Sequence, residues 1–172
     1  MREFDCEDEK KRFLKAYKCY DERAMDSLAE VIHIMPAPDF PAYDETPNDA
    51  VIFAQTGMDG CHYCMVKEND ELNIYYVEPG WIDVDRVFLI GHSISDILSY
   101  GLAIANLFFS QVFDMEKDTF LQEVNNAKQE WNVELNSNRL KKDLKALKKM
   151  FPITEISASE VYDRLRAMNP TK

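Results

Sequence analysis

The sequence predicts an α+β fold, in which a central antiparallel sheet of four or more strands has N-terminal and C-terminal helices packed around it. Three observations lead to this prediction. Apolar residues recur at helical spacing within 5–33, short segments rich in β-branched and aromatic residues alternate with turn formers within 50–90, and helical spacing returns after Gly91. Helices and strands thus occupy separate parts of the chain, which is typical of α+β proteins and differs from a βαβ alternation.

A single domain is expected over residues 1–172, because 46% of them are hydrophobic and a chain of this length can bury one sizeable core. Its expected parts are a helical segment with a proline-rich loop at 1–47, the sheet at 48–91, and helices at 92–172. The sequence contains neither an internal repeat nor a low-complexity tract that would divide it.

The first helix is predicted within residues 5–33, where apolar side chains three or four positions apart are separated by charged ones. These apolar residues are Phe13, Tyr17, Tyr20, Leu28 and Ile32. Three prolines follow between Met35 and Pro41. Each proline removes a backbone donor and pushes the preceding residue toward an extended conformation, so we expect a loop without regular structure there.

Four strands are predicted in the middle of the chain, joined by turns at 57–60 and 68–70 and by a longer connection through Pro79, Gly80 and Trp81. The expected strands span 50–56, 61–67, 71–77 and 86–90. The first of them has apolar residues on both faces, which predicts a central position in the sheet.

The helices of the last part are predicted from capping signals and apolar spacing. Ser93 and Asp96 stand at the positions of a capping box, and Gly101 is expected to end that helix. Ser157 and Glu160 form a second capping box, which should open the final helix. Three more helices are expected between them, within 102–112, 120–131 and 140–150.

The net charge of −11, from 31 acidic and 20 basic residues, argues against binding to nucleic acid or to an anionic membrane. Residues 1–120 contain 24 acids and 10 bases, so the acidic surface belongs to the first two-thirds of the chain. We therefore expect a neutral or basic protein partner, no nucleic acid and no membrane.

A cytoplasmic location is expected. No stretch reaches the roughly 18 apolar residues of a membrane span, and residues 1–8 are acidic where a signal peptide would be basic and then apolar. The four cysteines, which fit reduced thiols better than a disulfide framework, are Cys6, Cys19, Cys61 and Cys64.

The window from Thr56 to Cys64 has two interpretations. It contains the only CxxC, which favours a metal or redox site, and a Gly-Xaa-Asp-Gly turn, which favours a β-hairpin. Strand alternation would point Cys61 and Cys64 to opposite faces and separate their sulfurs. Zinc would also need further ligands, and no second pair is present. We expect no metal and no cofactor, with a metal- or redox-active protein centred on these cysteines as the alternative.

Catalytic patterns are weak elsewhere. Ser93 follows His92, but no GxSxG elbow is present and a serine at a helix start is typically a cap. Asp83 and Asp85 share one face and could bind a cation or act as an acid/base pair, although acid runs in an acidic protein are usually solvated. The chain also lacks a P-loop and HExxH. We expect no catalytic residue and no enzymatic activity.

The basic stretch 139–149 could, in isolation, bind calmodulin, a membrane or nucleic acid. Its stripe of Leu140, Leu144 and Leu147 is that of a packed helix. We therefore predict that it docks on the domain, with its lysines in solvent or facing the acidic side of the sheet.

Residues 48–112 resemble the SUKH superfamily, which contains bacterial immunity proteins and yeast regulators of cell-wall synthesis. The segments that carry the resemblance are the strand 51–54, the turn 56–60 with Gly57, Asp59 and Gly60, the aromatic strand at His62 and Tyr63, residues 90–93, and 97–102. The final helix at 161–165 is similar in kind to the family's closing helix. Met58 departs from the family, which commonly has a second glycine there, and residues 114–155 are longer than expected.

The resemblance implies an α+β fold and a non-catalytic binder, most often a bacterial immunity protein that neutralises a toxin by direct binding. Many such toxins are nucleases with basic substrate sites, so an acidic inhibitor would suit a toxin domain with a basic surface. We expect Glu78, Asp83 and Asp85 to form part of this surface, with Trp81 as an apolar anchor. In the alternative, Trp81 belongs to the core and the acids only maintain solubility. A regulatory scaffold that binds other cellular proteins is a further alternative.

Overall fold

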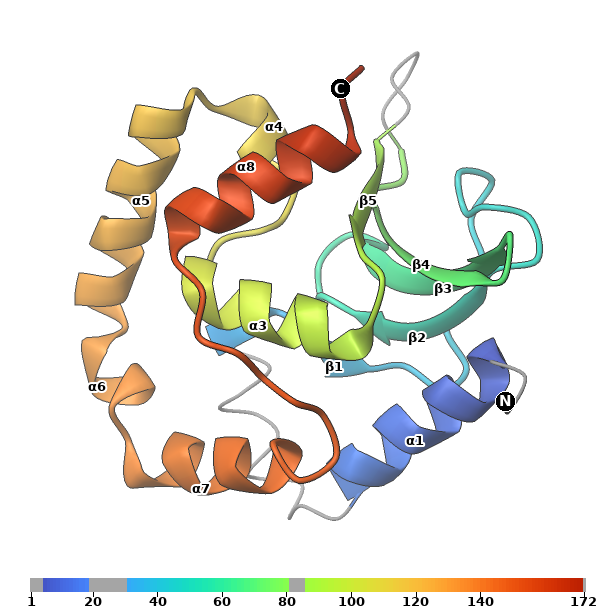
Figure 1. The fold of residues 1–172 in the computed structure, drawn as a ribbon, viewed down its shortest axis with the longest axis horizontal. Coiled ribbons are helices and arrows are strands. Elements are labelled where there is room, and N and C mark those ends of the chain that lie inside the picture. Colours follow the sequence, from blue (N-terminus) through green and yellow to red (C-terminus); the bar gives the residue numbers. More distant parts are fainter. Residues whose placement is uncertain (1–4, 19–30, 81–85, 172) are drawn as a thin grey trace.

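The predicted α+β fold is confirmed by the structure, a computed structural model that describes residues 5–18, 31–80 and 86–171 (Figure 1). An antiparallel sheet lies on one side of the molecule, and helices from both ends of the chain pack around it. The strands are β1 (Met35–Pro36), β2 (Val51–Gln55), β3 (His62–Glu68), β4 (Glu71–Val77) and β5 (Val87–Gly91). The helices are α1 (Cys6–Lys18), α3 (Ile94–Ile104), α4 (Gln111–Asp114), α5 (Lys117–Glu130), α6 (Asn132–Leu135), α7 (Asn138–Leu147) and α8 (Ala158–Met168).

The sheet is a meander in which the strand order follows the chain order, β1-β2-β3-β4-β5. All four predicted strands are present to within one or two residues at each end. Asn69 and Asp70, at φ of 51° and 64°, form the tight β3–β4 turn. The strand β2, which was expected to be central, is an inner strand that pairs with β1 on one side and with β3 on the other.

The strand β1 was not predicted, because its two residues open the proline-rich segment. Met35 pairs with Gln55 and Pro36 with Ala54, and the amide of Ala37 then donates to the carbonyl of Phe53 at 3.0 Å. A proline is tolerated at this position because an edge strand needs no donor on its outer side. The expectation of no regular structure between Met35 and Pro41 is therefore wrong for these first residues.

The opposite edge of the sheet is closed by a side chain from the C-terminal segment. The carboxamide of Asn169 accepts a hydrogen bond from the amide of Leu89 at 2.9 Å and donates to its carbonyl at 2.8 Å. Asn169 thus imitates one residue of a neighbouring strand. An exposed strand edge invites pairing with other chains, so this contact protects β5.

The two faces of the sheet are buried to different extents. The larger core lies between the sheet and the helices, where Phe13 of α1 meets Phe53 of β2 with ring centroids 5.2 Å apart. The smaller cluster, on the other face, contains Ile52, Cys64 and Val77. Phe40 and Ala50 from the loop 37–50 pack against it, so a loop covers the face that the helices leave open.

The helix α3 begins as predicted but ends later. Ser93 is its N-cap and accepts a hydrogen bond from the amide of Asp96 at 3.1 Å. Gly101 does not end it: a Cβ atom there would lie 3.2 Å from the Cβ of Ile32, so glycine permits close packing. The predicted helix at 102–112 is wrong, because α3 runs to Ile104 and α4 starts only at 111.

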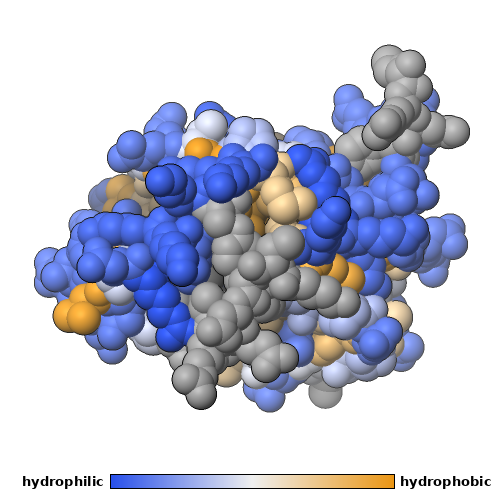
Figure 2. Space-filling model, turned by 90° about the horizontal axis from the view of Figure 1, so that it is seen from below, coloured by the Kyte–Doolittle hydropathy of each residue, from blue (hydrophilic) through white to orange (hydrophobic). Residues whose placement is uncertain are grey.

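The remaining helices agree with their sequence signals. Ser157 and Glu160 form both hydrogen bonds of the predicted capping box at the start of α8. In α7, Leu140 and Leu147 are buried while the lysines are exposed, which confirms that this basic helix docks on the domain. Figure 2 shows that hydrophilic side chains dominate the described surface seen from below, with hydrophobic ones in small separate areas.

The first predicted helix is only partly described. Residues 6–18 form α1 and residues 31–32 are helical, whereas 19–30 lie outside the described residues. Within the described part of the chain, no helix is both long enough and apolar enough to cross a membrane.

Candidate protein-binding site

The turn between β2 and β3 has the backbone geometry that its glycines predicted. Gly57, Asp59 and Gly60 adopt positive φ values of 84°, 36° and 81°. The amide of Cys61 donates to the carbonyl of Met58 at 2.8 Å, and the hydroxyl of Thr56 accepts from the amide of Met58 at 3.2 Å. Glycine adopts this left-handed region without steric cost, so the sequence of the turn fits its shape.

His62 is fully buried directly after this turn and ties it to the loop 37–50. Its Nδ1 lies 2.8 Å from the carbonyl of Gly60, which can only accept, so Nδ1 carries the proton. In the neutral ring Nε2 then accepts from the hydroxyl of Thr46 at 3.0 Å. The same hydroxyl oxygen accepts from the amide of Tyr43 at 2.9 Å. One imidazole therefore connects the turn with the far end of the loop.

Two aromatic rings enclose the imidazole. The centroids of Phe40 and Tyr43 lie 5.5 Å and 5.8 Å from that of His62, and the Tyr43 ring is nearly parallel to it. Burial in these surroundings lowers the pKa of His62, because the charged form would lose its hydration. The ring of Tyr43 also packs on Gly60, where a Cβ atom would come within 2.7 Å of it.

Exposed apolar and acidic side chains meet where the loop contacts the turn. Tyr43 is 40% exposed and Met58 is 52% exposed, and in the described part of the chain only Val133 is a further large hydrophobic residue with such exposure. Asp44 and Asp59 beside them are exposed as well. We call these four residues, Tyr43, Asp44, Met58 and Asp59, the loop–turn surface.

The loop–turn surface lies in the most acidic part of the chain. Residues 36–80 contain nine acidic residues and a single basic one, Lys67. Glu45 accepts a hydrogen bond from the amide of Gly80 at 3.0 Å, which lowers the pKa of its carboxyl group and attaches the loop to the residues after β4. Three of the four residues predicted to bind a partner, Trp81, Asp83 and Asp85, follow Gly80 in the sequence.

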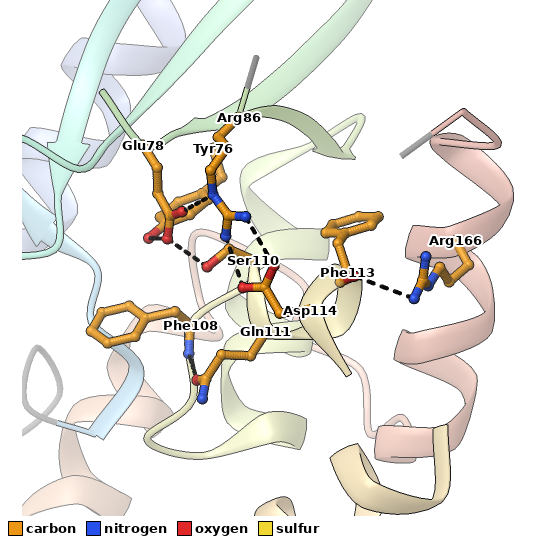
Figure 3. A network of polar contacts seen from close by, with 9 residues as sticks. All are labelled: Tyr76, Glu78, Arg86, Phe108, Ser110, Gln111, Phe113, Asp114 and Arg166. Atoms are coloured by element: carbon orange, nitrogen blue, oxygen red, sulfur yellow. Dashed lines mark hydrogen bonds and ion pairs between the residues drawn. The ribbon is translucent and has the colours of Figure 1, made fainter. Parts of the chain in front are cut away.

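Of the four residues predicted to contact a partner, Trp81, Asp83 and Asp85 lie outside the described residues. Glu78 follows β4, and its side chain is only 13% exposed. Its carboxylate accepts from Nε of Arg86 at 2.5 Å and from the hydroxyls of Tyr76 at 3.2 Å and Ser110 at 2.5 Å (Figure 3). This carboxylate is therefore engaged inside the molecule, and partner binding by these four residues stays a prediction.

Arg86 links the end of the β4–β5 hairpin to α4. Its two terminal nitrogens donate to the two carboxylate oxygens of Asp114 at 2.9 Å and 2.8 Å, while Nε faces Glu78 (Figure 3). Both carboxylates raise the pKa of Arg86, so the guanidinium stays charged. Glu78 follows β4 and Arg86 precedes β5, so their ion pair joins the ends of these two strands. We call Tyr76, Glu78, Arg86, Ser110 and Asp114 the Arg86 network.

Stacked rings continue this connection toward α8. The rings of Phe88 and Phe113 are nearly parallel with centroids 4.4 Å apart. The guanidinium of Arg86 lies 5.4 Å from the Phe88 centroid, and that of Arg166 lies 5.6 Å from the Phe113 centroid. Cations at both ends of an aromatic pair favour this arrangement, which joins β5, α4 and α8.

The two cysteines of the CxxC lie on opposite sides of the sheet, as strand alternation predicted. Cys61 packs against the larger core, and Cys64 is buried with Ile52 and Val77 in the smaller cluster. Burial raises the pKa of Cys64 to about 12 and raises that of Cys61. Both thiols therefore stay protonated at neutral pH, and the thiol form is a poor nucleophile and metal ligand. In the described ranges, no three His, Cys, Asp or Glu side chains are grouped to hold a metal ion.

Comparisons of the chain with protein families, with curated proteins and with solved structures found no match.

Two glycines with the same backbone conformation allow a matched test of the loop–turn contact. Gly80, at φ 88°, has no atom within 4 Å of a Cβ position, so we expect Gly80→Ala to cost about 1 kcal/mol for left-handed backbone alone. Gly60→Ala must also displace Tyr43 or Pro79 and should cost about 2 to 3 kcal/mol. Urea unfolding of both variants measures the difference. Equal losses would contradict the packing of Tyr43 on the turn.

The Arg86 network predicts an order of stability losses. Arg86→Met should cost about 3 kcal/mol, because it leaves the carboxylate of Glu78 partly buried without a cation. Asp114→Asn should cost less than about 1 kcal/mol, since the side chain of Asp114 is 43% exposed. Adding Glu78→Gln to Arg86→Met should recover part of the loss. The measurement is urea unfolding. Equal losses of unfolding free energy in Asp114→Asn and Arg86→Met would show that the carboxylate of Glu78 does not need the charge of Arg86.

His62 should make stability depend on pH. Its pKa in the folded protein lies below the ordinary 6.5, so the unfolded chain takes up the proton first as the pH falls. The free energy of unfolding should therefore decrease from about pH 7.5 to pH 5.5. His62→Asn keeps a donor for Gly60 and does not titrate. It should reduce this slope without abolishing it, because burial also lowers the pKa of His33. Thermal melts across this range are the measurement, and an unchanged slope would contradict the buried neutral imidazole.

Proposed function

We propose that this chain is a non-catalytic protein-binding domain that uses an acidic surface to bind a basic protein. In its most specific form, the proposal is that of a bacterial immunity protein that neutralises a toxin domain by direct binding. The observation that carries the proposal is the loop–turn surface, where two of the exposed large hydrophobic side chains stand beside two carboxylates.

The composition of this surface suits a protein partner. Apolar anchors near the centre of an interface provide most of the binding energy, and Tyr43 and Met58 are residues of the types enriched there. The surrounding acids, including the exposed Asp39 and Asp49, would accelerate encounter with a basic partner. Such steering weakens as the salt concentration rises.

The loop–turn surface is also held in place before any partner arrives. His62 fixes the loop to the turn by hydrogen bonds at both ring nitrogens, and Glu45 attaches the same loop to Gly80. A surface that is already ordered loses less conformational entropy on binding, which increases affinity. The resemblance to the SUKH superfamily rests partly on this turn, so the same residues support both the fold and the proposed role.

The experiment is co-expression of this chain with each protein encoded by neighbouring genes. We expect one neighbour to arrest growth when expressed alone, the chain to restore growth, and the two proteins to co-purify. Met58→Ser combined with Asp44→Lys and Asp59→Asn should weaken binding by at least tenfold while the melting temperature stays unchanged. Asparagine is chosen at position 59 because it tolerates the positive φ there.

Matched control substitutions lie on the helical side of the molecule. Val133→Ser removes another exposed apolar side chain, and Glu130→Lys reverses another exposed acid. Both controls should bind like the wild type. The proposal fails if no neighbouring protein is toxic, or if the loop–turn variant binds a rescued toxin as tightly as the controls do.

A further inference from the structure

A groove lies on the helical side of the molecule, between α3, α5, α7 and the segment 153–156. Its volume is about 290 Å³. The apolar part of its lining comes from Leu102 and Ala103 of α3, Leu144 of α7, and Ile153 and Ile156. It plays no part in the loop–turn surface, since α5 and α7 lie on the far side of α3 from the sheet (Figure 1).

The hydroxyl of Ser99, which also lines the groove, is already occupied. It donates to the carbonyl of Ser95 at 2.6 Å and accepts from the amide of Thr154 at 3.1 Å. Polar recognition of a ligand is therefore left mainly to the charged side chains of the lining, which are Lys128, Lys148 and Glu155.

The two lysines give the groove its positive character. Among the described residues, neither Lys128 nor Lys148 has a carboxylate within ion-pair distance. Both lysines are exposed at the rim of the groove, and partial burial lowers the pKa of Lys128. A positive charge without a carboxylate partner is stabilised when an anion binds beside it.

A second hollow continues from Lys128 along α5. It has a volume of about 420 Å³ and is lined by Asn125, Gln129 and Asn132 together with Lys128. Asn125, Lys128 and Gln129 lie three or four positions apart on one face of α5, and Asn132 is the first residue of α6. Side-chain amides can donate to an anion, so the polar end of a ligand would find donors beside Lys128 while its apolar end entered the groove.

We propose that this groove binds a small amphipathic carboxylate. The carboxylate lies at Lys128, with Lys148 as the second cation, and the aliphatic tail packs on Leu102, Leu144 and Ile153. The volume of about 290 Å³ supports a small ligand and not a protein segment, because it lies just below the range for drug-sized pockets, about 300–1,000 Å³. An occupied groove would connect α5, α7 and the segment 153–156 to α3.

The test uses octanoate as the probe, with octan-1-ol and butyrate as matched ligands. Octanol has the tail without the charge, and butyrate has the charge with a short tail. Isothermal titration calorimetry of the full chain should give octanoate at least tenfold tighter binding than either. The melting temperature should rise with octanoate concentration, as ligand binding to the folded state requires.

The variants separate the groove from adventitious binding. Lys128→Gln with Lys148→Gln should weaken octanoate binding at least tenfold, whereas Lys141→Gln with Lys145→Gln, on exposed positions of α7, should leave it unchanged. NMR shift changes should centre on the amides of 99–103, 125–132 and 153–156. Equal affinity for octanoate and octanol would overturn the proposal. So would equal octanoate affinity of the two double lysine variants, or NMR shift changes centred on other residues. None of these results depends on whether the chain is an immunity protein.

Discussion

The burial of both faces of the sheet is the constraint on which the rest of this structure depends. Helices cover one face, and the loop 37–50 covers the other by placing Phe40 and Ala50 over a small apolar cluster. A loop is a weak cover unless it is fixed, because its backbone groups are not paired in a ladder. His62 supplies the fixation through Thr46 and Gly60. The loop–turn surface then follows from the same contacts, since the chain that covers the face must leave Tyr43 and its acidic neighbours outside.

Partly buried and exposed carboxylates have different surroundings in this fold. Glu78 is partly buried, and it is satisfied by a guanidinium and two hydroxyls, as a desolvated carboxylate requires. The outer acids of the loop and turn are exposed instead, and they produce an excess of negative charge over the sheet side of the chain. The exposed lysines of α7 belong to the opposite, helical side. The proposed protein-binding surface and the proposed anion-binding groove therefore lie on different sides of the molecule.

The sequence predicted those parts of the fold that depend on local chemistry. Alternation gave the strands and placed Cys61 and Cys64 on opposite sides, and the Ser157–Glu160 pair marked the start of the last helix. Contacts between distant residues were missed. Arg86 meets Asp114 across 28 positions with no local signal, and Gly101 resembles a helix stop unless the approach of Ile32 is known. The sequence also predicted an acidic surface that included Glu78. Only the fold shows that Glu78 points into the molecule, whereas Tyr43 and Met58 are exposed.

The most direct measurement of the central claim is hydrogen–deuterium exchange of the chain alone and in complex with the partner recovered by co-expression. In the free protein, the amide of Tyr43 should already exchange slowly because Thr46 accepts its hydrogen bond. On binding, protection should increase across 38–50 and 56–61, with no change along α5 and α7. Protection confined to the helical side, with unchanged exchange in the loop and turn, would contradict the account.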